Sequence, residues 1–197
     1  QEGMRYACEA LADPGDVALI PDPCYPVFQA GTLLAGATPH YYRLTAENGF
    51  LPDVDEIPAD VARAARYLVV SLPANPVGSV GTPEVYGRII AFAKEHDIVV
   101  IHDNAYSDIV FDGPAGGSFL GYPGALDVEF FSLSKSFDVT GARLSFVVGR
   151  TDIVAAVRKL RSQVDFGMFY PEQAAAVAAL TGPREQVERQ RLAYQAR

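Results

Sequence analysis

The chain has little of what several protein classes require. Cys8 and Cys24 are the only cysteines in 197 residues, which is too few for a disulfide framework and favours reduced thiols in a cytoplasmic protein. Basic residues are scarce, because 16 Lys and Arg face 24 Asp and Glu, and the net charge is −8. Without a basic stripe to neutralise phosphates, we expect no nucleic-acid partner. The same acidity disfavours anionic membrane surfaces.

Long apolar runs are missing as well. The apolar segments are short and broken by proline, glycine or charge, so we expect none to cross a bilayer. No basic segment followed by an apolar one marks a secretion signal. The chain begins Gln-Glu-Gly-Met and stops inside a polar helical run over 188–197. We therefore expect it to be a piece cut from a longer protein.

Several catalytic signatures are absent from the sequence. There is no glycine-rich P-loop and no G-x-G-x-x-G motif, which disfavours a nucleotide ligand. There is no G-x-S-x-G elbow of the kind that α/β-hydrolases carry. The three histidines are scattered and leave no plausible zinc set, so we expect no metal site.

Short β-branched or aromatic runs alternate with helical stretches along the chain. Five such runs, and a weaker one at 38–42, are predicted strands: 17–20, 67–71, 98–102, 128–132 and 144–148. Helices are predicted over 26–35, 82–94 and 152–163. Most of the runs lack polar alternation, as strands buried on both faces of a parallel sheet do. This alternation predicts a three-layer α/β/α fold.

The last strand breaks the parallel pattern. Only about ten residues separate Ser132 from Leu144, and a parallel crossover needs a dozen or more. We therefore expect the strand at 144–148 to run antiparallel to its predecessor. Its beginning then lies at the edge of the sheet where the other strands end.

Polar residues gather at this edge. The clusters lie at 23–26, 73–78, 103–106, 132–135 and 140–143. Ligands of open α/β sheets bind beyond the carboxyl ends of the strands, so the sequence predicts a site here. The amine of Lys135 and the carboxylate of Asp103 suit Schiff-base chemistry on pyridoxal 5′-phosphate (PLP), which needs a lysine to hold it and an anion at its pyridine nitrogen.

Four of these motifs together resemble the class I/II (fold type I) PLP-dependent aminotransferases. They are Asn75-Pro76-Val77-Gly78, Asp103-Asn104-Ala105-Tyr106, Ser132-Leu133-Ser134-Lys135 and Gly141-Ala142-Arg143. The likeness covers nearly the whole chain. Tyr25-Pro26 and residues 48–52 are most similar to the LL-diaminopimelate aminotransferase-like branch. Val77 and Ala142 depart from the usual threonine and tryptophan, and neither change removes a group that the chemistry requires.

The resemblance implies a role for each site residue. Lys135 forms the Schiff base and carries the proton transfer. The other implied cofactor contacts are Asp103 at the pyridine nitrogen, Asn75 and Tyr106 at the ring hydroxyl, Tyr25 on the ring face, and Ser132, Ser134 and Arg143 at the phosphate. Simpler roles remain open: a helix N-cap for Asp103, a core position for Tyr25, a carboxylate partner for Arg143 and loop caps for the two serines.

The resemblance also implies an organisation and an activity. Residues 1–165 correspond to the PLP-binding large domain, truncated at its N-terminus, and 166–197 to a helical segment leading towards the remainder. The activity is transfer of an amino group between an amino acid and a 2-oxo acid, in a parent protein expected to be a homodimer. Alternatives are a C–S β-lyase of the same fold, a ligand-sensing domain of a transcription regulator, and a fragment that is inert by itself.

Overall fold

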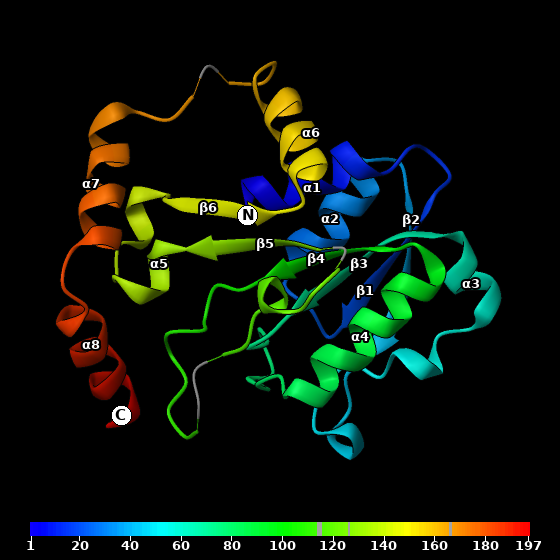
Figure 1. Cartoon of the computed structure of the whole chain (residues 1–197), viewed down its shortest axis with the longest axis horizontal. Coiled ribbons are helices and arrows are strands. Elements are labelled where there is room, and N and C mark those ends of the chain that lie inside the picture. The colour runs from blue at the N-terminus through cyan, green and yellow to red at the C-terminus, as the bar shows by residue number, and fades with distance from the viewer. Residues whose placement is uncertain (114–115, 126, 166) are drawn as a thin grey trace.

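The protein is built around one twisted sheet. The computed structural model describes residues 1–113, 116–125, 127–165 and 167–197 (Figure 1). Within these residues the sheet has six strands in the order β2-β1-β3-β4-β5-β6. The strands are β1 (Val17–Asp22), β2 (Thr38–Arg43), β3 (Ala65–Ser71), β4 (Val99–Asp103), β5 (Asp127–Ser132) and β6 (Ser145–Gly149). All pairs are parallel except β5–β6, which is antiparallel, and this confirms the expected topology.

Helices and short turns join the strands. The helices are α1 (Glu2–Leu11), α2 (Pro26–Leu34), α3 (Ala59–Ala64), α4 (Pro83–His96), α5 (Leu133–Ser136), α6 (Thr151–Arg161), α7 (Tyr170–Thr181) and α8 (Glu185–Gln195). The 3-10 turns are η1 (Ala46–Asn48), η2 (Val54–Glu56), η3 (Phe119–Gly121) and η4 (Thr140–Ala142). The three helices predicted at 26–35, 82–94 and 152–163 correspond to α2, α4 and α6, with ends shifted by up to two residues.

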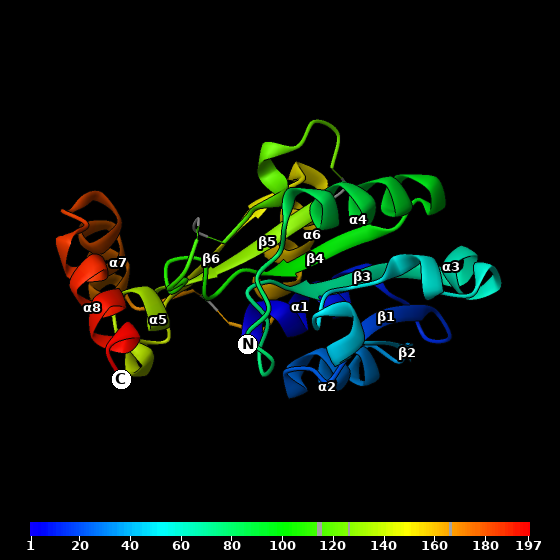
Figure 2. The same ribbon diagram turned by 90° about the horizontal axis from the view of Figure 1, so that it is seen from below.

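Helices cover both faces of the sheet. Figure 2 shows α4 on one side and α1 and α2 on the other, which confirms the three-layer prediction. The period of two along a strand divides its side chains between the layers. In β3, Leu68 and Val70 belong to the core under α4, whereas Tyr67 and Val69 belong to the core shared with α1, α2 and α6.

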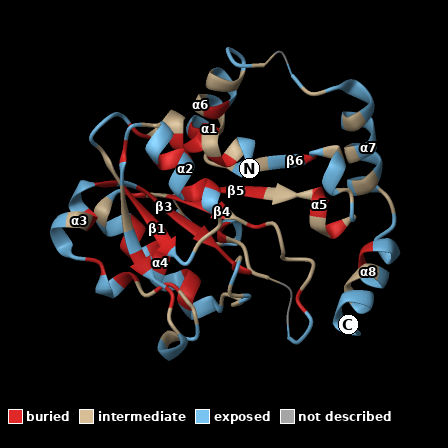
Figure 3. Ribbon diagram, turned by 180° about the vertical axis from the view of Figure 1, so that it is seen from behind, coloured by how far each residue is buried: buried red, intermediate tan, exposed pale blue. Residues whose placement is uncertain are grey.

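Burial falls away from the centre of the sheet (Figure 3). The central strands are buried on both faces, as expected. In contrast, β6 is largely exposed, with Phe146 37% and Val148 43% accessible, because it is an edge strand. No residue of α7 is buried, and in α8 only Val187 is. The boundary predicted at 165/166 falls where residue 166 lies outside the described residues.

The strand ends meet on one side of the molecule. In the antiparallel pair Ser132, the last residue of β5, lies opposite Ser145, the first residue of β6. The beginning of β6 therefore lies at the edge where the parallel strands finish, as predicted. Among the described residues no helix is long and apolar enough to span a membrane.

Candidate functional site

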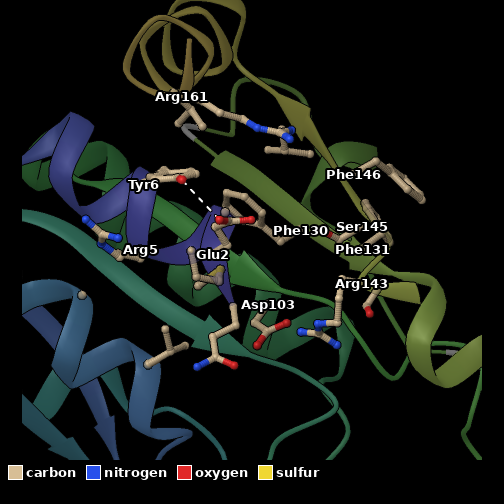
Figure 4. A pocket seen from close by; sticks show the side chains of 18 of the residues that line it. Glu2, Arg5, Tyr6, Asp103, Phe130, Phe131, Arg143, Ser145, Phe146 and Arg161 are labelled. Carbon is tan, nitrogen blue, oxygen red and sulfur yellow. Dashed lines mark hydrogen bonds between the residues drawn. The ribbon is translucent and has the colours of Figure 1, made fainter. Parts of the chain in front are cut away.

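A pocket of about 770 Å³ opens at this edge of the sheet. Its lining includes four residues singled out from the sequence: Asp103, Ser132, Ser134 and Arg143. Figure 4 shows the carboxylate of Asp103 and the guanidinium of Arg143 pointing toward one another. The far end of the pocket is lined by α1 and α6, from which Glu2, Arg5 and Arg161 contribute. A cation and an anion thus face a common space.

Asp103 is the last residue of β4. Its neighbour His102 lies on the opposite face of the sheet, against Tyr86 and Phe119, and strand alternation therefore turns Asp103 into the pocket. Burial raises the pKa of the Asp103 carboxyl above its ordinary value of 3.8. Asp103 does not cap a helix, because the segment after it contains no helix before η3 within the described residues.

Lys135 lies on the single turn of α5 that follows β5. Its Nζ atom is 6.0 Å from the centre of the Tyr106 ring. Its backbone carbonyl accepts a 2.6 Å hydrogen bond from Nε2 of Gln190 in α8. The turn begins at Ser132, whose Oγ accepts a 3.2 Å bond from the backbone N–H of Ser134. Ser132 is therefore a helix cap, and its own hydroxyl proton remains available to a ligand.

The two phenols and the carboxamide form a second group beside the amine. Asn75 Nδ2 donates to the Tyr106 hydroxyl over 3.4 Å. Burial raises the pKa of Tyr106, and the charge of Asp103 raises it further, so the two side chains lie within electrostatic reach of one another. Tyr25 donates to Oε1 of Gln1 over 3.2 Å and meets Phe28 edge to face at 6.0 Å.

Arg143 stands at the bend between η4 and β6. It adopts a left-handed backbone conformation with φ of 53°, and its Nη1 donates to the carbonyl of Thr140 over 2.7 Å. Among the described residues it forms no ion pair, so the carboxylate-partner alternative gains no support. Lys135, Tyr106, Asn75 and Tyr25 lie outside the described lining of the large pocket.

Two features escaped the sequence analysis. His102 received no role, yet its Nδ1 lies 3.3 Å from Oε1 of Glu129, and both side chains are 0% exposed. Gln190, which contacts the Lys135 turn, lies in a helix without a recognisable motif. The register of β4 and β5 places His102 beside Glu129, so the pairing of these strands could have suggested their contact. No feature of the sequence near Gln190 indicates its contact with the Lys135 turn.

The donor set fits one cofactor chemistry well. In the described part of the chain no group of three or more His, Cys, Asp and Glu side chains could hold a metal. An amine, a buried carboxylate, a guanidinium and hydroxyls meet at one sheet edge instead. A cationic heterocycle would relieve the cost of burying the Asp103 carboxylate, and a phosphate would find a fork of donors in Arg143.

The sequence matches a family model along almost all of its length. Residues 2–197 match the model described as "Aminotransferase class I and II". The chain is 45% identical over its whole length to the LL-diaminopimelate aminotransferase of Moorella thermoacetica and covers 51% of it. It is 46% identical over 95% of its length to the enzyme of the same name from Desulforudis audaxviator and covers 48% of it. The chain thus spans about half the length of the curated relatives it matches.

Solved structures give the same result. Substrate-bound BacF of Bacillus subtilis superposes with a TM-score of 0.95 at 38% identity, over 98% of this chain and 50% of that one. A probable N-succinyldiaminopimelate aminotransferase of Thermus thermophilus gives a TM-score of 0.94 at 32% identity, over 100% of this chain and 53% of that one.

Proposed function

Because this chain belongs to the aminotransferase class I and II family, which is PLP-dependent, we propose that it is the cofactor-binding part of an aminotransferase. The proposed reaction moves an amino group between an amino acid and a 2-oxo acid. The observation that supports it best is Asp103 facing Arg143 in the large pocket. This pair offers an anion for a ring nitrogen and a cation for a phosphate within one space.

Lys135 and Asp103 carry the proposed chemistry. Bound PLP supplies an electron sink that stabilises negative charge on the substrate carbon. Asp103 keeps the pyridine nitrogen protonated, because its buried carboxylate favours a neighbouring cation. Lys135 provides the amine that attaches the cofactor and afterwards carries the substrate proton. The Tyr106 ring, whose centre lies 6.0 Å from its Nζ, helps to position the amine.

The remaining site residues bind and orient. Arg143, Ser134 and the free hydroxyl proton of Ser132 donate to the phosphate. Asn75 and Tyr106, already joined by a hydrogen bond, hold the ring hydroxyl, and Tyr25 covers the ring face.

The organisation is proposed on the same grounds. Residues 1–165 form the cofactor-binding unit, and the weakly buried helices after it lead towards further parts of a parent protein. That parent is proposed to be a cytoplasmic homodimer. Since relatives carry the name LL-diaminopimelate aminotransferase, LL-diaminopimelate is the first amino donor to assay.

Covalent trapping tests the cofactor and its lysine together. The purified chain is mixed with PLP, its visible spectrum is recorded, and borohydride reduction is followed by peptide mass mapping. We expect the label on Lys135, its loss in Lys135→Ala, and its retention in Lys159→Ala, which removes an exposed lysine of α6. A label scattered over surface lysines would overturn the proposal.

Product analysis tests the reaction type. An aminotransferase turns over only when a 2-oxo acid accepts the amino group. Release of ammonia without an acceptor would instead identify a lyase of the same fold.

A further inference from the structure

We propose that Glu129 is a positioning residue for Asp103. It fixes the two chain neighbours of Asp103, His102 and Asn104, through contacts with their side chains. The inference rests on the proposed role of Asp103 at the cofactor ring. Glu129 lies on the face of the sheet opposite to the pocket, and its buried carboxylate has no part in the chemistry proposed above.

Glu129 contacts both chain neighbours of Asp103. On the preceding side, Nδ1 of His102 lies 3.3 Å from its Oε1. On the following side, Nδ2 of Asn104 donates to its Oε2 over 3.2 Å. His102 and Glu129 are register partners in the β4–β5 pair, so their side chains emerge side by side on one face. The carboxylate thus spans the position of Asp103 from behind.

The Glu129 carboxylate is fixed by further hydrogen-bond donors. The Ser118 hydroxyl lies 3.0 Å from each Glu129 oxygen, and the backbone N–H groups of Phe119 and Leu120 also donate to Oε1. Burial acts to raise the pKa of Glu129, but the neighbouring side chains of His102, Asn104 and Ser118 lower it overall. Glu129 is therefore an ionised side chain fixed by several partners. It can in turn restrict the side chains of His102 and Asn104.

The surroundings of His102 exclude water. Its ring meets Phe119 at 5.1 Å and Tyr86 at 6.0 Å, both edge to face. Its Nε2 lies 3.0 Å from the carbonyl oxygen of Leu72. Both ring nitrogens thus face oxygen atoms. The ring is held between β3, through the carbonyl of Leu72, and β5, through the carboxylate of Glu129.

These contacts determine where the Asp103 side chain points. The backbone N–H of Asn104 donates to the carbonyl of Phe130 over 2.9 Å, and Asp103 itself pairs with Phe130 in the register. With residues 102 and 104 fixed on the back face, the backbone between them has little freedom, and the Asp103 carboxylate is aimed at the pocket. Misplacing a catalytic group by about 1 Å can cost roughly 100-fold in rate.

Asp127 provides a matched control. It is a buried acid two residues before Glu129 on β5 and lies on the same face. Its Oδ2 atom makes no hydrogen bond among the described residues. Asp127→Asn and Glu129→Gln therefore remove the same charge from the same face, but only the second weakens the contacts to residues 102 and 104.

The first measurement needs no cofactor. The carboxyl carbon signal of Asp103 is assigned by NMR in the ligand-free chain and followed against pH. We expect its midpoint and line width to change in Glu129→Gln and in Asn104→Ala, and to stay close to the wild-type values in Asp127→Asn. Asn104→Ala removes one contact to Glu129 but keeps the Glu129 carboxylate. It therefore tests the proposal even if Glu129→Gln does not fold.

The second measurement adds PLP labelled with ¹⁵N at the ring nitrogen. We expect Glu129→Gln to bind PLP roughly tenfold more weakly, the effect of a weakened charged hydrogen bond, and to shift the nitrogen signal toward the unprotonated ring. An unchanged Asp103 titration in both Glu129→Gln and Asn104→Ala, or the same change in Asp127→Asn, would overturn the positioning role. A wild-type chain that binds no PLP would refute the proposed function alone, because the titration still decides the role of Glu129.

Discussion

Burial disfavours the charged form of the Asp103 carboxyl. Burial raises its pKa from 3.8, so between 3.8 and the raised value the folded chain binds a proton that the unfolded chain has released. Stability therefore declines as the pH rises through this window. A carboxyl buried at a cost to folding is typical of groups kept for function.

Removing this carboxyl tests the penalty directly. In the ligand-free chain we expect Asp103→Asn to lose the decline of the unfolding free energy above pH 3.8, and to be more stable than the wild type at neutral pH. Urea unfolding between pH 3 and 8 measures both effects. Asp22→Asn, at the exposed end of β1, should keep the decline. Parallel pH profiles for Asp103→Asn and the wild type would contradict the prediction.

Arg143 offers a test of the phosphate contact. Lysine keeps the charge but cannot form a two-pronged bond, so we expect Arg143→Lys to weaken PLP binding by roughly tenfold. Equilibrium titration of the visible spectrum measures this change. Arg158→Lys makes the same replacement in α6 at another part of the pocket lining and should leave the Kd unchanged. Equal affinities for both variants would argue against Arg143 as the phosphate ligand.

Among the elements, β6 approaches its neighbour most closely at Gly149. Gly149 at its end has φ of 150°, and a Cβ there would lie 2.7 Å from the Cα of Val128 in β5. Only glycine lets the two backbones come so near.

A pair of alanine substitutions tests that close approach. Gly149→Ala should lower the unfolding free energy by about 2 kcal/mol, since the strands must separate or strain. Gly87→Ala, where a Cβ in α4 meets nothing within 4 Å, should raise it by roughly 0.5–1 kcal/mol. Urea denaturation compares them. A neutral effect at Gly149 would mean that β6 can shift without loss.

The short turn of α5 shows how local and distant contacts combine. Its cap, Ser132, is part of the motif that holds Lys135, so this contact is readable from the residues themselves. Its other support is Gln190, 55 positions further along the chain. The sequence motif therefore predicted where the turn begins, whereas the contact from Gln190 required the packing of α8.

For the molecule as a whole, the apolar surface is unevenly distributed. In α7 the side chains of Tyr170 and Val177 are 82% and 61% exposed, and Figure 3 shows the helix in the colours of exposed and intermediate residues, with none of it buried. Single exposed apolar residues are common, but a contiguous face marks a site of contact. Since the chain spans about half the length of its curated relatives, the exposed side chains of α7 are compatible with such a contact.

This surface predicts self-association of the isolated chain. We expect light scattering or sedimentation to show a concentration-dependent increase in mass, reduced at least tenfold in apparent affinity by Val177→Asp, because burying a charge without a partner is costly. Gln173→Asp adds the same charge at an exposed polar position of α7 and should change little. A wild-type chain that remains monomeric at all concentrations would contradict the expectation.

The sequence by itself determined the architecture and the chemistry of the proposed site. Hydrophobic runs of strand length, and a connection too short for a crossover, predicted the sheet and its antiparallel strand, because these signals are local. Tertiary structure decided what no window of sequence contains: that His102, Asn104 and Glu129 meet on the back face, and that β6 and α7 lie exposed. Strand pairing and burial both depend on contacts between residues that are distant in the sequence, and only the folded arrangement brings those residues together.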